Sequence, residues 1–147
     1  MKNKFFIFFL LIFFNFEILN ADKYLFEVAN MSVNNKGNLI IAYDGKIISE
    51  ENDLQIKAQN FKYIKNQDLL EAKNGFIIIK DEKLEIKFNK LTINKKNIIT
   101  ASGGILVNDL QNSLDIKSET IVVDRNNKII SSNEKSIIKD KNNNTIT

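Results

Sequence analysis

The chain has 147 residues, enough for one domain, and a formal net charge of +3. It contains neither His nor Cys, which excludes disulfides and thiolate chemistry and removes the commonest general base and metal ligand. Its charges are interspersed along the sequence, whereas a nucleic-acid-binding protein gathers them on one face with aromatic residues between. We therefore expect no nucleic acid, metal or cofactor.

The N-terminal segment has the layout of an export signal. Two lysines precede an unbroken apolar run of ten residues at 5–14, and a small residue, Ala21, follows. Ten helical residues span about 15 Å, half the ~30 Å hydrocarbon core of a bilayer. We predict that residues 1–21 are a signal peptide and that the mature protein begins near Asp22 in the periplasm. An uncleaved inner-membrane anchor is the alternative, because Leu19 occupies a position where a small residue is preferred.

Three later stretches are copies of one another. They open at Gly45, Gly75 and Gly104, which are 30 and 29 residues apart, and each carries a Leu-x-Ile-Lys motif nine or ten residues further on. A half unit precedes them at residues 26–33, and a decayed unit follows at 129–138. A fixed period of this size predicts one supersecondary unit stacked several times. We assign residues 22–138 to this domain and expect a frayed tail at 139–147.

Within the units, apolar and polar residues alternate with period two, which is typical of strands with one apolar and one solvated face. Asn-Gly at 74–75 and Ser-Gly-Gly at 102–104 have the chemistry of turns, and so do 65–68, 94–97 and 124–128, at equivalent points of successive units. The sequence therefore predicts an all-β fold of about eleven to thirteen short strands in one sheet.

Such a sheet must roll or fold over to hide its apolar face. It can fill its interior with side chains, or it can stay partly open around an apolar trough. The repeated Lys57, Lys87 and Lys117 fall on the opposite face, where solvated lysines keep a sheet soluble. Asp109 with Asp115 forms a candidate carboxylate pair, and Glu51 with Asp53 another, but neither has a partner base or metal spacing. We therefore expect no enzyme.

Five stretches share a looser strand pattern: LIIAYDGKII at 39–48, LLEAKNGFII at 69–78, IITASGGILV at 98–107, LDIKSETIVVD at 114–124 and KIISS at 128–132. This pattern resembles the OstA-like family over roughly residues 24–138. That family includes LptA, the periplasmic part of LptC and the N-terminal domain of LptD, which carry lipopolysaccharide from the inner to the outer membrane of Gram-negative bacteria. In size, and in its signal-like N-terminus, the chain is most similar to LptA.

The resemblance implies an antiparallel β-jellyroll, V-shaped and partly open, whose apolar interior shields acyl chains. It also implies end-to-end docking, with further copies of the chain or with LptC- and LptD-like jellyroll domains. A ~12-carbon chain left in water costs about 10 kcal/mol, which such an interior would offset. The alternative is a structural or adhesive β-repeat protein with a solid core and no lipid. The residues that would line the lipid are Leu54, Ile56, Phe61, Phe76, Leu84, Ile86, Phe88, Leu114 and Ile116.

Overall fold

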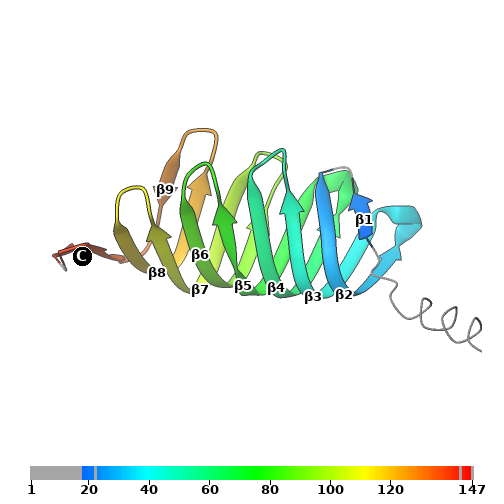
Figure 1. Cartoon of the computed structure of the whole chain (residues 1–147), viewed down its shortest axis with the longest axis horizontal. Helices are drawn as coiled ribbons and strands as arrows, with labels where there is room; N and C mark the ends of the chain where they lie inside the picture. The colour runs from blue at the N-terminus through cyan, green and yellow to red at the C-terminus, as the bar shows by residue number, and fades with distance from the viewer. Residues whose placement is uncertain (1–17, 22, 143, 147) are drawn as a thin grey trace, which may run out of the picture.

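The computed structural model describes residues 18–21, 23–142 and 144–146, and it forms one antiparallel sheet of eleven strands (Figure 1). Strands β1 to β8 follow one another in chain order, β10 and β11 continue beyond β8, and β9 also pairs with β8. The all-β class and the strand count are as predicted. The elements are β1 (Ile18–Ala21), β2 (Tyr24–Asn34), η2 (Asn35–Gly37), β3 (Leu39–Ser49), β4 (Leu54–Ile64), η3 (Lys65–Gln67), β5 (Leu69–Ile79), β6 (Leu84–Ile93), β7 (Ile98–Asp109), β8 (Leu114–Asp124), β9 (Ile129–Ser131), β10 (Ile137–Asp140) and β11 (Thr145–Ile146).

The predicted export segment lies mostly outside the described residues, as does the predicted mature start at Asp22. Its last four residues are described, and they form β1, which pairs with β2 from Ile18 opposite Glu27 to Ala21 opposite Tyr24. This end of the predicted signal peptide is therefore part of the sheet.

Five of the long strands, β3 to β6 and β8, change their buried face halfway along. In β3, Ile40 and Ala42 are buried before the midpoint, and Ile47 and Ser49 are buried after it. Because side chains alternate between the two faces, a buried set that moves from even to odd positions marks a bend in the strand. The same change recurs in β4, β5, β6 and β8. In β7 the buried positions stay odd, and the register with β8 instead shifts between Ser102 and Ile105. The sheet from β3 to β8 is therefore folded along one line. This bent, open sheet is a partly open β-jellyroll.

Two-residue segments that end in glycine make the bends in β3, β5 and β7. Asp44 and Asn74 have left-handed φ values of 51° and 54° and are followed by Gly45 and Gly75, whereas β7 uses two glycines, Gly103 and Gly104. Asn-Gly and Ser-Gly-Gly were expected to be turns that separate short strands, and that expectation was wrong. Each lies in the middle of a strand of eleven or twelve residues. A left-handed residue followed by Gly turns a chain through a bend as readily as through a hairpin.

The line of bends divides the sheet into two arms. The first arm ends in the turns at 35–38, 65–68, 94–97 and 125–128, which we call the first rim. The second arm ends in the turns at 50–53, 80–83 and 110–113, together with Lys23 just before β2, and we call these residues the second rim. The predicted turns at 65–68, 94–97 and 124–128 are thus confirmed, and all three lie on the first rim.

Successive units are also tied together along the rims. The backbone N–H of Lys65 donates to the carbonyl of Asn38 at 2.8 Å on the first rim. On the second rim Lys80 donates to Asp53 and Leu110 donates to Lys83, both at 3.0 Å. These bonds satisfy turn groups that strand pairing leaves free, so the repeat continues from the strands into the loops.

The tail is more ordered than expected. Ile137–Asp140 pairs with β8, with Ile138 opposite Ile116, and Thr145–Ile146 folds back onto it. The Asp140 carboxylate closes this hairpin by accepting bonds from the backbone N–H groups of Asn142 and Asn144, both at 2.8 Å. The expectation of a frayed segment at 139–147 missed this Asp-centred turn.

Candidate lipid-binding interior

Six of the nine residues predicted to line the interior are buried on the inner face, and Ile56 and Ile86 have no exposed surface at all. The cross-strand register explains their alignment, since Ile47, Ile56, Ile77, Ile86 and Val107 face one another in a single row from β3 to β7. The six buried residues are Leu54, Ile56, Phe61, Leu84, Ile86 and Phe88.

Leu114 and Ile116 belong to the same rows but are only half-buried. They stand opposite Asp109 and Val107 on β7, which continues the inner face into β8. Beyond β8 the second arm has only the four residues of β10 and the short β11. These two side chains therefore lie near the C-terminal end of the interior, where fewer residues cover them.

Phe76 is not an inner-face residue, and this prediction needs correction. It is half-buried, whereas its neighbour Ile77 is fully buried. It stands opposite Lys57 on one side and Lys87 on the other, and both lysines are exposed. The bend at Gly75 moves the buried set of β5 to odd positions, so Phe76 lies on the outer face. The three repeated lysines lie there as well, as the alternation predicted.

Most of the wall formed by the first arm was not predicted from the sequence. Strands β5 and β7 each begin in the first arm with two apolar residues, Leu69-Leu70 and Ile98-Ile99. The second residue of each pair is buried on the inner face, and the inner side chains continue from there at every second position. A search for the face change at each bend would have found them. The buried apolar residues of this wall are Ile40, Ala42, Phe61, Tyr63, Leu70, Ala72, Leu91, Ile93, Ile99, Ala101, Ile121 and Val123.

Large and small side chains alternate along this wall next to the bends. Ala42, Phe61, Ala72, Leu91 and Ala101 stand opposite one another in that order across the strands. The alanines leave space that the larger neighbours and the facing arm occupy, so that the narrow part of the V can be packed closely.

The two arms are in contact across the interior. The ring of Tyr24 on the second arm packs edge-on against that of Tyr63 on the first, with centroids 5.0 Å apart and an interplanar angle of 83°. Phe26 packs against the same Tyr63 at 6.4 Å. With these contacts and a fully buried core, side chains fill the space between the arms. An acyl chain could occupy this interior only if the arms moved apart.

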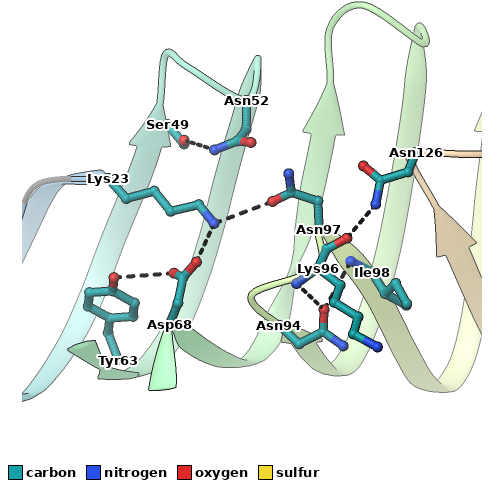
Figure 2. Close-up of polar contacts among 10 residues, drawn as sticks. All are labelled: Lys23, Ser49, Asn52, Tyr63, Asp68, Asn94, Lys96, Asn97, Ile98 and Asn126. Atoms are coloured by element: carbon teal, nitrogen blue, oxygen red, sulfur yellow. Dashed lines mark hydrogen bonds and ion pairs between the residues drawn. The ribbon is translucent and has the colours of Figure 1, made fainter. Parts of the chain in front are cut away.

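Polar side chains span the mouth between the two rims. Lys23, on the second rim, donates through Nζ to Asp68 Oδ2 at 2.7 Å and to Asn97 Oδ1 at 3.3 Å, both on the first rim (Figure 2). Asp68 also accepts a bond from the Tyr63 hydroxyl at 3.3 Å. Lys23 further lies 5.6 Å from the centre of the Tyr24 ring, within the range of a cation–π interaction.

A second polar group crosses the mouth in the opposite direction. Arg125, on the first rim, donates through Nη2 to Asp81 Oδ1 at 2.9 Å and through Nε to Glu82 Oε1 at 3.1 Å, both on the second rim. The side chain of Arg125 is only 10% exposed. Arg125 is the single arginine of the chain, and its fork of donors allows it to hold two carboxylates at once.

Tyr24 contributes an unusual buried hydroxyl beside the first of these groups. Among the described residues it is the one buried side-chain polar group without a hydrogen-bond partner. Burial, with smaller contributions from the charge of Asp68 and from Tyr63, raises the pKa of Tyr24 well above its ordinary value. The group therefore stays protonated at neutral pH and keeps a donor that is not used.

The carboxylates of Asp109 and Asp115 do not face each other, and Asp109 has a structural role. Asp109 is buried, and its two oxygens accept bonds from the backbone N–H and the side-chain amide of Asn112, at 2.8 and 2.7 Å. It therefore closes the turn between β7 and β8, whereas Asp115 stands opposite Asn108 on the outer face. Over the part of the chain that the structure describes, no three acidic side chains gather into a metal site.

Both ends of the sheet leave apolar side chains exposed. Val33, at the free edge of β2 in the first arm, is 48% exposed, and Ile129 on β9 at the opposite end is 54% exposed. Ile137 and Ile146 are exposed at the C-terminal end of the second arm. An unpaired strand edge with apolar side chains is a surface on which another strand can add.

None of the helical segments in the described ranges is long and apolar enough to cross a lipid bilayer. The sequence matches no protein-family model and no curated protein.

Proposed function

We propose that this chain is a periplasmic lipopolysaccharide-binding and transport protein of the OstA-like kind, which shields acyl chains between the two arms of its sheet. The observation that carries the proposal is an unbroken apolar interior that runs from β2 to β8 in a sheet that does not close. Exchange of an acyl chain between a bilayer and such an interior is nearly neutral in free energy, since both surroundings are apolar. Transport then needs a shield and an external driving force, with no catalytic group.

A structural β-repeat protein with a solid core is the second candidate. It is favoured by the near-zero exposure of the inner side chains, because a fully packed interior needs no ligand. The two candidates differ in one property, which is whether the arms separate to admit an apolar molecule.

Titration with a dansyl-labelled undecanoic acid tests this difference. We expect a saturable, blue-shifted rise in fluorescence as the probe leaves water for the interior. Lipopolysaccharide should displace the probe, and its polysaccharide portion stripped of acyl chains should not. A folded protein that leaves the probe in water at every concentration would instead support the solid-core candidate.

We further expect the protein to associate end to end, either with itself or with similar jellyrolls. Val33→Lys and Ile129→Lys each place a charge on an exposed apolar end without disturbing the core. Each should shift sedimentation velocity profiles towards the monomer over a concentration series. Such a contact joins two different surfaces, so it produces chains of molecules rather than closed dimers.

The matched control is Tyr43→Lys, because Tyr43 is 45% exposed but lies on the outer face of β3, one strand in from the free edge of β2. Association that is equally sensitive to all three substitutions would place the contact on the outer face instead. A protein that is monomeric at every concentration and does not bind a second jellyroll would exclude end-to-end docking.

A further inference from the structure

The polar groups centred on Lys23 and Arg125 connect the two arms, whereas the Lys46–Glu27 and Lys62–Glu71 ion pairs connect strands within an arm. Lys46 with Glu27 and Lys62 with Glu71 each join neighbouring strands of one arm, at 2.9 and 3.6 Å. Backbone hydrogen bonds already hold those strands together. Lys23 and Arg125 instead join rims that no strand pairing connects, and the partners lie 43 to 74 residues away in the sequence.

The cations of the cross-mouth pairs, although not their partner Asp81, are also better shielded from water. The side chains of Lys23 and Arg125 are 17% and 10% exposed, against 39% for Lys46. Less exposure means weaker screening by salt and a stronger ion pair, so these two groups resist separation of the arms more than a surface pair would. Lys23 precedes β2, at the N-terminal end of the sheet, and Arg125 directly follows β8, near its C-terminal end.

The unpartnered hydroxyl of Tyr24 has the opposite effect. A buried donor without an acceptor raises the free energy of the closed arrangement, and it would regain hydrogen bonds if the rims parted and water reached it. Tyr24 packs against Tyr63 of the other arm, so separation at this point exposes it directly. The mouth therefore combines contacts that favour the closed state with one that favours the open state.

We propose that Lys23 with Asp68 and Asn97, and Arg125 with Asp81 and Glu82, are two clasps that hold the mouth of the interior shut, and that their release admits an acyl chain. The inference rests on the proposed lipid-binding function, because the clasps control access to that interior. Rupture of two ion pairs needs no covalent step, so a competing anionic group at the mouth favours the open state, and high salt weakens the pairs to a smaller extent.

Rim separation can be measured without any lipid. The chain has no cysteine, so Glu51→Cys on the second rim and Lys95→Cys on the first take spin labels at two chosen sites only. Both residues are exposed and lie outside the clasps. In a Lys23→Met and Arg125→Met background, we expect the distance between the labels to lengthen and its distribution to broaden. The control background is Lys46→Met and Lys62→Met, which removes two cations and two ion pairs, each of which lies within a single arm.

Uptake of the dansyl-labelled undecanoic acid, followed by stopped flow, gives a second readout. We expect uptake to be about tenfold faster in the clasp variant and to change less than about twofold in the control. Raising NaCl should accelerate uptake by the wild type and have little effect on the clasp variant. Tyr24→Phe removes the unpartnered hydroxyl and keeps the ring, so it should slow uptake.

The two readouts separate the clasps from the function on which they rest. Rims that stay at the wild-type distance in the clasp variant would overturn the clasps, whatever the probe does. If the rims part in the clasp variant but no variant takes up the probe, the clasps are supported and the lipid-binding function is excluded. Equal acceleration in the clasp and control variants would assign the effect to net charge and would also overturn the proposal.

Discussion

Replacement of Ile86 by Asp is expected to destabilise the protein by about 4 kcal/mol or more, a large fraction of the total stability of a small domain. Ile86 has no exposed surface and lies between Ile77 and Val107 in the central row of the second arm. The substitution removes a buried apolar side chain and leaves a carboxylate without a partner in its place. Urea denaturation followed by circular dichroism measures the loss as a lower midpoint.

Lys87→Asp, one residue further on, is the matched control. Lys87 is exposed and stands between Phe76 and Leu106 on the outer face, so the same new carboxylate should cost less than about 0.5 kcal/mol. Equal midpoints for the two variants would show that the register assigned to β6 is wrong.

The pH dependence of the Ile86→Asp variant gives a further check. Burial raises the pKa of the new carboxyl in the folded state above its unfolded value of about 3.9. The unfolded chain then loses this proton at a lower pH than the folded chain, so the destabilisation grows as pH rises above about 4. We expect the difference between variant and wild type to be smaller at pH 4 than at pH 7.

The repeat and its alternation were sufficient to predict the class and the single sheet. They were sufficient because Leu54, Leu84 and Leu114 recur at nearly constant spacing, and alternation over four or five residues already specifies a strand. The same pattern placed Ile56 and Ile86 correctly on the inner face. These conclusions depend only on local sequence, which is the level at which periodicity carries information.

The sequence did not reveal the fold of the sheet along its midline. Asn74-Gly75 has the same composition whether it closes a hairpin or bends a strand, and only pairing with β4 and β6 on both sides of it decides between them. This ambiguity misplaced Phe76 and concealed the wall of the first arm. The clasps were equally hidden, because contacts between Lys23 and Asp68 depend on how two distant turns meet.

The second large effect is expected at the bends themselves, where Gly75→Ala should cost about 3 kcal/mol. The φ of Gly75 is not left-handed, so backbone conformation does not require glycine here. Space does, because an added Cβ would lie 2.8 Å from the Cα of Ala58 and closer still to the carbonyl oxygen of Lys57. Both are backbone atoms of β4, which cannot move aside without breaking its pairing with β5.

Gly37→Ala is the contrasting control, since it separates conformation from space. Gly37 has a φ of +89° and nothing within 4 Å of an added Cβ, so the substitution strains one exposed turn and should cost only about 1 kcal/mol. Hydrogen exchange should also show lost protection on both sides of the bend in β4 and β5 for Gly75→Ala, and only near residues 35–38 for Gly37→Ala. If Gly75→Ala cost no more than Gly37→Ala, the close approach of β4 would not determine the cost of substituting Gly75. The sharp bend at Gly75 would then not depend on contact between neighbouring backbones, and the arms could be set at other angles without a glycine at this position.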